Sequence, residues 1–498
     1  MEITFNYSGL YQQLETSDAL FKNVPLPTGC EPSSEETFTL SLFEVIFSIQ
    51  NGCAHVSITY DTGLKHQDGI TTWVQNYRQA LLGAVALLKE AEPQWTLSDF
   101  PSVFNSYQDI GTFHAETLVS FNVEMNAVES IYPCSPMQEG ILTSQQKDPA
   151  SYRCYTVFQV KEPAQGSVDL DRIKAAWKAV VLQHELLRTI FISAVPNSAK
   201  VFNMIIKDPS PSIVIFDQVD EDVNVEFFRA RHDADQQAKG HLEHHLSICR
   251  HKSGQVYVCL YINHALIDAH SQRIIQQDFV DAYNGNFTAS GAPPYKSFVD
   301  YLEEQSPDEA QEYWMNRLRG AEPCHFPQLI ASNEMDGTTK RSLTVPNLES
   351  NMFSVFCREH EITPATLIQA AWAMVLQEYT GSLAVSFGNL ASGRDLPIDE
   401  VNGIVGPLIG MTTCHVRLDP DATVLETLQA IQSDGISSLK HQTTSLASIH
   451  KILELKSTAL FNSIMSVQRM SESQNGDADF AVFDAQEAHD PTDVSEYV

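Results

Sequence analysis

The sequence predicts a two-lobed α/β fold, in which each lobe is an α+β sandwich of strands and covering helices. Apolar residues alternate with period two in short runs and recur at helical spacing in longer runs, which indicates strands mixed with helices. This mixture occurs on both sides of the proline pair Pro293-Pro294. Two mixed halves of one chain favour two sandwich lobes that pack together.

The first hundred residues are predicted to form a small unit of their own, with a boundary after residue 103. A strand is expected at 37–48, then a hairpin turn at Asn51-Gly52, a second strand and a helix at 70–90. Because residues 1–103 are few for a full hydrophobic core, we interpret them as part of a larger fold. Residues 104–130 are weakly patterned and are expected to be a linker.

The remaining residues are predicted to supply the two lobes, at 131–292 and 293–498. Three helices are expected to begin where a Ser or Thr precedes a proline, since a hydroxyl caps a helix and proline suits its first turn. These starts are Ser135-Pro136, Ser306-Pro307 and Thr363-Pro364.

The composition indicates a soluble globular chain, with 43% hydrophobic and 19% charged residues. No run of about 18 apolar residues is present, so no transmembrane helix is expected. The N-terminus has neither the basic nor the apolar region of a signal peptide. The nine cysteines are scattered and form no CxxC pair, which indicates reduced thiols and a cytoplasmic location.

The net charge and the motifs that are missing exclude several function classes. A formal net charge of -32 argues against nucleic acid and anionic membrane as partners, because both require a basic face. Solubility alone also explains this charge. No P-loop and no GxGxxG occurs, so no nucleotide site is expected.

One loop lies at a strand-to-helix turn near the middle of the chain. The strand before it is indicated by Val256, Val258, Leu260 and Ile262, and the helix after it by Ile274, Ile275, Phe279 and Ala282. His264 lies on this loop, and Asp268 follows four residues later. Two regular elements can hold such a loop and aim an imidazole, although N-H-x-x-x-D alone is more often a packed or solvated histidine.

A short internal repeat links the two ends of the chain. Phe5-Asn6-Tyr7-Ser8 is similar to Phe461-Asn462-Ser463-Ile464, with an identical Phe-Asn pair. We therefore interpret residues 1–103 as the end of a unit similar to the one at the C-terminus. The second lobe is expected to be truncated, without its own hairpin and final helix, as in a fragment cut from a longer chain.

Several motifs occur in one order along residues 131–498. They are Tyr132 to Gly140, His184 to Thr189, Asn263 to Ser271, Tyr295 to Leu302, Gly403 to Gly410, and Leu460-Phe461-Asn462 with Gln468. This ordered set resembles the core motifs of nonribosomal peptide synthetase condensation domains, particularly those of fungi. Residues 1–103 resemble the C-terminal tail of an epimerization or condensation domain of the same superfamily.

The resemblance implies two chloramphenicol-acetyltransferase-like lobes in a V with a central tunnel. The implied reaction is peptide-bond formation between a carrier-bound donor thioester, aminoacyl or peptidyl, and a carrier-bound aminoacyl acceptor. An upstream epimerization domain would favour a D-configured donor. The implied partners are upstream and downstream peptidyl carrier domains and an adjacent adenylation domain. The phosphopantetheine belongs to the carriers, and no cofactor is implied for this chain.

The family motif His-His-x-x-x-Asp-Gly matches Asn263 to Ala269. The resemblance therefore implies that His264 is the catalytic residue and that Asp268 supports the loop. Asn263 replaces the first His and Ala269 replaces the Gly. An Asn can still hydrogen-bond the neighbouring backbone, so the loop is expected to be supported by Asn263 as well.

Further support of this loop is expected from an arginine paired with Asp268. Arg188 and Arg394 are the candidates, and family analogy favours Arg394. Ser271 and Gly406 are candidate residues of the substrate tunnel. Ser271 is also expected to start the following helix as its N-cap rather than to act as a nucleophile, because no GxSxG elbow is present. His270 is expected to be a flanking loop residue.

A second histidine cluster, His241 to His245, has spacing that suggests a metal site. It lacks a third well-spaced ligand group, so we interpret it as a polar, solvated turn and expect no metal. Two alternatives to the condensation reaction stay open. One is a non-catalytic or truncated carrier-docking module, and the other is a free-standing acyltransferase of the same fold.

Overall fold

The computed structural model divides the chain into two compact units, Met1–Gln94 and Trp95–Val498. It describes residues 3–10, 41–50, 53–61, 63–90, 94–161, 167–232, 242–289, 291–326, 343, 350–455, 458–467 and 483–489. Among these residues, no helix is both long and apolar enough to cross a membrane.

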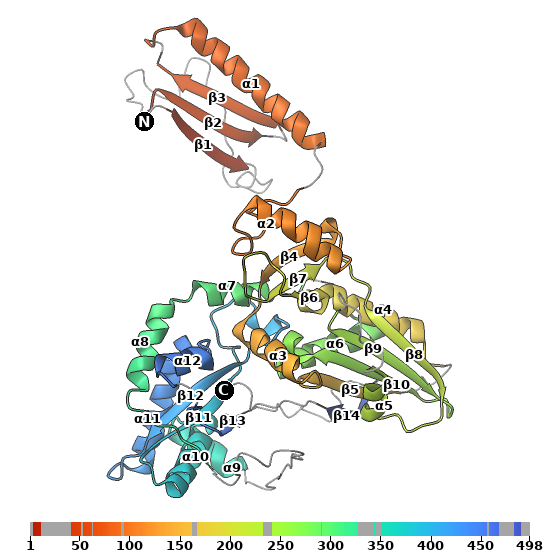
Figure 1. Ribbon diagram of the computed structural model, residues 1–498, viewed down its shortest axis with the longest axis vertical. Helices are drawn as coiled ribbons and strands as arrows, with labels where there is room; N and C mark the ends of the chain where they lie inside the picture. Colours follow the sequence, from red (N-terminus) through yellow and green to blue (C-terminus); the bar gives the residue numbers. More distant parts are fainter. Residues whose placement is uncertain are drawn as a thin grey trace. The chain divides into compact units, whose positions relative to one another are not determined.

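In its described residues, the N-terminal unit contains a three-stranded sheet and a long helix (Figure 1). The strands are β1 (Ile3–Leu10), β2 (Phe43–Gln50) and β3 (Cys53–Tyr60), and the helix is α1 (Gln67–Glu90). Strand β2 pairs in parallel with β1 and in antiparallel with β3. The pairing of Gln50 with Cys53 closes a tight hairpin. The predicted turn residues Asn51-Gly52, and the start of the strand predicted at 37–48, lie outside the described residues.

Residues 95–130 belong to the second unit and are folded, which differs from the expected boundary at 103 and the expected linker at 104–130. They contain α2 (Tyr107–Thr112), the π-helix η2 (Phe113–Leu118) and the 3-10 helix η3 (Met125–Ala127). Phe104, Ile110 and Phe113 are buried in one cluster with strand residues such as Phe202. Their apolar spacing is short and interrupted by polar residues, so it gave no clear helical period.

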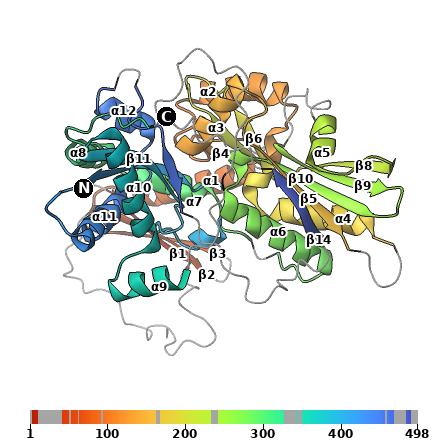
Figure 2. The same cartoon turned by 90° about the horizontal axis from the view of Figure 1, so that it is seen from below.

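The first lobe of the second unit is built on two sheets (Figures 1 and 2). One has the order β14-β5-β10-β9-β8 and the other the order β4-β7-β6. The bounds are β4 (Val128–Pro133), β5 (Arg153–Val160), β6 (Thr189–Ile192), β7 (Phe202–Ile206), β8 (Ser212–Val219), β9 (His244–His251), β10 (Val256–Asn263) and β14 (Phe483–His489).

Helices α4 and α6 pack together on the five-stranded sheet, and their apolar faces form the largest core cluster. Trp177 of α4 contacts Phe279 of α6 edge to face, with ring centroids 5.8 Å apart. The helices of this lobe are α3 (Pro136–Lys147), α4 (Leu170–Gln183), α5 (Val225–His232) and α6 (Ala269–Asn284), with the 3-10 helices η4 (Glu185–Arg188) and η5 (His264–Leu266).

The second lobe has one three-stranded sheet with the order β12-β11-β13. Its strands are β11 (Ala384–Ala391), β12 (Gly410–Arg417) and β13 (Ile464–Ser466). Its helices, with α7 leading into the lobe, are α7 (Lys296–Glu304), α8 (Pro307–Arg317), α9 (Ser350–Glu359), α10 (Pro364–Thr380), α11 (Val424–Ser438) and α12 (Leu446–Ile452), with η6 (Val401–Gly403) and η7 (Leu439–His441).

All three predicted Ser-Pro and Thr-Pro helix starts are confirmed. Ser135, Ser306 and Thr363 are the N-caps of α3, α8 and α10, and each side chain accepts a hydrogen bond from the first turn of its helix. Gly381 ends α10 with a positive φ of 69°, a conformation that costs glycine little.

Strand β14 leaves the second lobe and joins the sheet of the first. It pairs in antiparallel with β5, with Phe483 opposite Val160 and His489 opposite Tyr155 (Figure 2). The five-stranded sheet that carries β10 is therefore completed by residues from the C-terminal end of the chain.

Candidate active site

His264 lies immediately after strand β10, in the single 3-10 turn η5 that leads to helix α6. Its backbone N–H donates to the carbonyl of Tyr152 over 2.9 Å. Its imidazole lies edge to face with the Tyr152 ring, with centroids 6.2 Å apart. The side chain is only 6% exposed, so the imidazole is held by packed neighbours rather than by water.

Asn263, the residue before the histidine, fixes the turn through its side-chain amide. Its Oδ1 accepts from the backbone N–H of Ala265 at 3.0 Å, as expected from the sequence. Its Nδ2 donates to Gln145 Oε1 and to Glu243 Oε2, both at 3.1 Å. An Asn at this position thus supplies both a donor and an acceptor, and all of its contacts stabilise the turn.

Asp268 begins helix α6 as its N-cap, a position that the sequence assigned to Ser271. The Asp268 carboxylate accepts from the backbone N–H and from the hydroxyl of Ser271, each at 2.7 Å. Ser271 therefore lies inside the first turn of the helix, where its backbone N–H donates to the N-cap instead of Ser271 being the N-cap. His270 also belongs to α6 and not to a flanking loop, and its Nε2 lies 3.0 Å from the carbonyl oxygen of Asn402.

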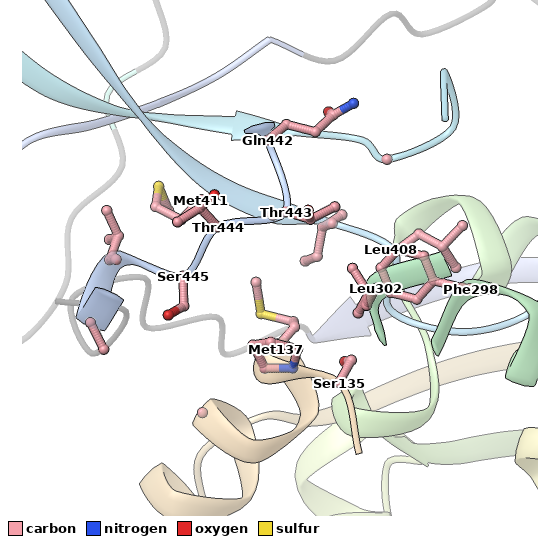
Figure 3. A pocket seen from close by; sticks show the side chains of 17 residues that line it. Ser135, Met137, Phe298, Leu302, Leu408, Met411, Gln442, Thr443, Thr444 and Ser445 are labelled. Atoms are coloured by element: carbon pink, nitrogen blue, oxygen red, sulfur yellow. The ribbon is translucent and has the colours of Figure 1, made fainter. Parts of the chain in front are cut away.

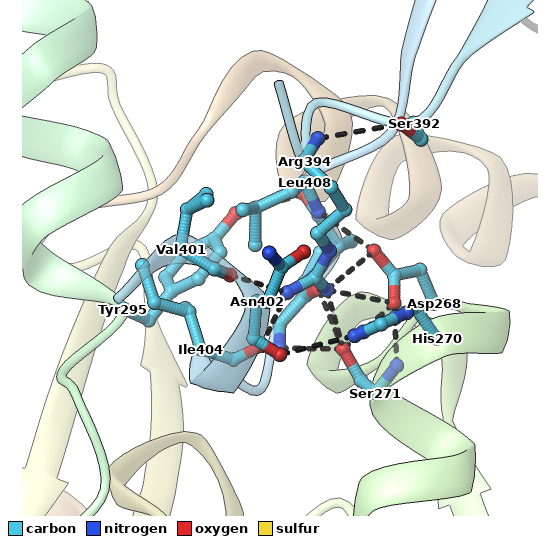
Figure 4. A network of polar contacts seen from close by, with 12 residues as sticks. Asp268, His270, Ser271, Tyr295, Ser392, Arg394, Val401, Asn402, Ile404 and Leu408 are labelled. Carbon is cyan, nitrogen blue, oxygen red and sulfur yellow. Dashed lines mark hydrogen bonds and ion pairs between the residues drawn. The ribbon is translucent and has the colours of Figure 1, made fainter. Parts of the chain in front are cut away.

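Asp268 forms a buried ion pair with Arg394 (Figure 4). Arg394 Nη2 donates to the two carboxylate oxygens of Asp268, at 3.0 and 2.9 Å, and their side chains are only 8% and 2% exposed. Nη1 of Arg394 donates to the carbonyls of Val401 and Ile404 at 2.9 and 2.7 Å. Because Asp268 belongs to the first lobe and Arg394 to the second, this pair joins the lobes beside the His264 turn.

Ser271 and Gly406 complete this network. The Ser271 hydroxyl lies 2.9 Å from both the backbone nitrogen and the carbonyl oxygen of Gly406. A Cβ added to Gly406 would lie 2.1 Å from the ring of Tyr295, so only glycine fits. The structure thus places both residues, expected in a substrate tunnel, in a packed polar contact between the lobes. Neither lines the cavity described next.

An apolar cavity of about 230 Å³ lies between the two lobes (Figure 3). Its walls come from the N-terminal end of α3, from α7, from the start of β12 and from the segment before α12. The lining residues are Ser135, Pro136, Met137, Gly140, Phe298, Leu302, Gly393, Leu408, Ile409, Gly410, Met411, Gln442, Thr443, Thr444, Ser445, Leu446 and Ala447.

The cavity is connected to the His264 turn through its walls. The backbone N–H of Leu408 donates to Asp268 at 3.2 Å. Met137 packs against a buried cluster that contains Ala265, the residue after His264. A group bound in this cavity would therefore touch the same elements that hold the imidazole.

A family model for the condensation domain matches residues 128–497. The chain belongs to the condensation-domain family. This confirms the resemblance drawn from the ordered motifs, and it makes this chain a member of an amide-bond-forming class of transferases.

Relatives of this condensation domain include nonribosomal peptide synthetases of fungi. The chain is 34% identical over 478 residues to the nonribosomal peptide synthetase dtxS1 of Metarhizium robertsii, covering 96% of this chain and 6% of that protein. It is 35% identical over 501 residues to nonribosomal peptide synthetase 4 of Gibberella zeae, covering 99% of this chain and 6% of that protein. The chain thus spans a small fraction of the length of the relatives that it matches.

Solved structures show the same fold. The condensation domain of the monacolin K polyketide synthase MokA superimposes with a TM-score of 0.54 and 18% identity, over 75% of this chain and 88% of that one. The holo form of AB3403, a four-domain nonribosomal peptide synthetase bound to AMP and glycine, gives a TM-score of 0.57 and 19% identity, over 69% of this chain and 27% of that one. The predicted two-lobed fold class is confirmed.

Arg188 supports a different part of this condensation domain. It pairs with Glu129, and its Nη1 donates to the carbonyl of Ile206 at 2.8 Å. The neighbouring Glu185 accepts from the hydroxyl of Tyr132 at 2.9 Å and from the backbone N–H of Lys296 at 2.8 Å. Burial raises the pKa of Glu185. The motif from His184 to Thr189 therefore anchors strand β4 and helix α7 rather than the His264 turn.

Gln138 supports the His264 turn, a role that sequence reasoning missed. Its Nε2 donates to the carbonyl of Ala265 at 3.0 Å, and the amide also bonds Asn203. At the same time its Oε1 accepts from the backbone N–H of Ser135, completing a capping box at the start of α3. The Ser-x-x-Gln spacing of that box was the available signal.

The second histidine cluster is buried in strand β9 and is not a solvated turn. His244 and His245 are 1% and 7% exposed. Nε2 of His244 lies 2.6 Å from the carbonyl oxygen of Leu187, and His245 stacks on Tyr261 with centroids 5.0 Å apart. Burial lowers the pKa of His244 to about 4 and that of His245 to about 2. Within the described residues, no group of three metal-ligating side chains could hold a metal ion, and His241 lies outside them.

Proposed function

We propose that this chain catalyses amide-bond formation between a carrier-bound donor thioester and a carrier-bound aminoacyl acceptor, with His264 at the reacting centre. The observation that carries the proposal is the Asp268–Arg394 pair, which fixes the His264 turn against the opposite lobe. A catalytic group must be held in place to gain from proximity, and a buried, hydrogen-bonded charge pair provides that rigidity.

The proposed step requires a neutral amine next to a thioester carbonyl. The amine nitrogen attacks the carbonyl carbon, the C–N bond forms, and the collapse of the tetrahedral intermediate breaks the C–S bond. The departing thiolate ends as the carrier's thiol, and the amine loses one proton. His264 accepts that proton or orients the amine, a contribution of about 10²–10⁴-fold in rate.

The proposed substrates arrive on phosphopantetheine arms of carrier domains upstream and downstream, with an adenylation domain nearby, in the cytoplasm. The four-domain synthetase among the matching structures supports this setting. We propose that the N-terminal unit, predicted at residues 1–103 and bounded in the structure as Met1–Gln94, is the tail of an upstream epimerization or condensation domain. An epimerization domain upstream would favour a D-configured donor. The three-stranded sheet and the helix α1, as far as the described residues show them, are consistent with an element that completes a larger sheet.

The test presents donor-loaded and acceptor-loaded carrier proteins to the full chain and to His264→Ala. Product from the parent and none above background from the variant supports the proposal. His251→Ala is the matched control, because His251 lies at the half-buried end of β9 and its imidazole hydrogen-bonds Ser253 only, among the described residues. If neither the parent nor a version extended beyond Val498 gives product, the catalytic proposal fails and the carrier-docking alternative remains.

A further inference from the structure

The cavity between the lobes has a lining without charge. None of its seventeen lining residues is Asp, Glu, Lys, Arg or His, in a chain in which 19% of residues are charged. Transfer of a charged group into such a site is costly, since no opposite charge compensates for the lost water. The lining therefore selects against charged side chains before any shape is considered.

Two methionines face the cavity from opposite lobes. Met137 belongs to α3 of the first lobe, and Met411 belongs to β12 of the second. Figure 3 shows the Met137 side chain extending from α3 toward the segment that carries Thr443 to Ser445. Thioether side chains are flexible and polarizable, so they adapt to aliphatic and aromatic groups alike.

Hydroxyl groups lie along the same walls. Thr443 and Thr444 are half-buried, and their hydroxyls make no hydrogen bond to any other described residue. Ser445, in contrast, is committed as the N-cap of α12. Two free hydroxyls beside an apolar lining can bind the amide groups that flank a side chain, as polar groups in ligand sites commonly do.

From these features we infer that the cavity is a specificity pocket for one aminoacyl substrate and takes an uncharged, apolar side chain. This inference rests on the proposed function. A volume of about 230 Å³ is below the roughly 300–1,000 Å³ of pockets that enclose drug-sized ligands, so it suits a single side chain. The contacts of Met137 with the Ala265 cluster and of Leu408 with Asp268 connect an occupied pocket to the His264 turn.

Gly140 offers a direct way to fill the pocket. It lines the cavity from within α3, and a Cβ added there meets no atom within 4 Å. Ala and Leu both have a higher helix propensity than glycine inside a helix. Gly140→Leu therefore reduces the pocket while favouring the fold. Gly435→Leu is the matched control, because Gly435 lies in α11, does not line the cavity and also has open space at its Cβ.

The experiment measures the dissociation constants of non-hydrolysable aminoacyl-pantetheine amides that carry Ala, Leu, Phe, Asp or Lys side chains. The parent is expected to bind the Leu and Phe amides at least roughly tenfold more tightly than the Asp and Lys amides. Gly140→Leu is expected to weaken the Leu and Phe amides by about tenfold and the Ala amide by less than about threefold. Gly140→Ala and Gly435→Leu should preserve the parent's order of affinities.

Met137→Ala provides the opposite change, since it enlarges the pocket and should improve binding of a Trp amide relative to the Leu amide. Equal affinity for all five amides, or an unchanged order in both Gly140→Leu and Met137→Ala, would overturn the inference. His264→Ala separates binding from catalysis. This variant should keep the parent's order of amide affinities and lose product formation. Selective binding by a parent that makes no product would retain the pocket and reject the proposed function.

Discussion

His244 and His245 lie on strand β9, and His264 directly follows the adjacent strand β10, yet their surroundings differ. All three side chains are nearly inaccessible to water. His244 and His245 lie inside β9, where the ladder opposes them to Ile262 and Tyr261 of β10. His264 lies one residue beyond the end of β10, in a turn held by capping residues and by an ion pair. Burial is common to all three histidines, so it is the position on a turn held by polar contacts between a strand and a helix that distinguishes His264 and that the proposed function uses.

The largest expected effect separates the two histidine sites by rate. His264→Ala should reduce product formation by about 10²–10⁴-fold, the usual contribution of a positioned acid or base. His245→Phe, which keeps a ring against Tyr261, should change the rate by less than about threefold. Single-turnover measurements with loaded carriers give both numbers. Similar losses in the two variants would remove the distinction drawn between the sites.

The ion pair provides the second expected effect, on stability. Arg394→Ala leaves the carboxylate of Asp268 buried without its cation, which should lower the free energy of unfolding by about 3–5 kcal/mol. Arg394→Lys keeps the charge but loses the planar fork, so an intermediate loss is expected. Urea titration of both variants gives the values. Lys440→Ala, which removes an exposed ion pair with Glu309, is the control. If Arg394→Ala lowers the free energy of unfolding no more than Lys440→Ala does, the Asp268–Arg394 pair is not needed for stability.

The free energy of unfolding should depend on pH through the buried histidines His244 and His245 of β9. Because the folded state lowers the pKa of His244 to about 4 and of His245 to about 2, the unfolded chain binds more protons below the ordinary pKa of about 6.5. Stability from these groups is therefore complete above pH 6.5 and is lost as the pH falls from there toward 4. The urea midpoint measured from pH 7.5 to 4.5 should fall less steeply in His245→Phe. Parallel curves for parent and variant would contradict this assignment.

The smallest effect is expected at Asn263. Asn263→His restores the residue of the family motif, and an imidazole can offer one donor and one acceptor in place of the amide contacts. The rate of product formation should change by less than about tenfold, because Asn263 only orients the turn and His264 is still present in the variant. The rates of the parent, Asn263→His and Asn263→Ala are measured together. Asn263→Ala removes the hydrogen bonds to Ala265 and Gln145 and is expected to be slower than Asn263→His. A rate rise of a hundredfold or more would mean that the Asn form is impaired.

The sequence was most informative where the signals are local. Ser and Thr caps before proline gave three correct helix starts, and the spacing of His264 and Asp268 between a strand and a helix indicated the braced turn. Both signals depend on contacts within a few residues. The choice of Arg394 over Arg188 came from family resemblance, because pairing between distant segments leaves no periodic trace in one sequence.

Features that depend on distant segments could not be predicted in this way. The bond from Gln138 to Ala265 joins α3 to η5, and the burial of His244 depends on the carbonyl of Leu187. The helices within 104–130 are short and owe their stability to packing against β7, not to their own pattern. The Ser271 assignment failed because Asp268, three residues earlier, is an equally good N-cap and also binds Arg394.

Strand β14 is synthesised after the other strands of its sheet, which affects folding during synthesis. The ribosome releases β5, β9 and β10 long before Phe483 emerges, so the edge of the sheet at β5 stays unpaired during that interval. An open edge is a template for pairing with other chains, and contacts that are distant in sequence form slowly. The nascent first lobe is therefore exposed to mispairing along β5 until β14 arrives.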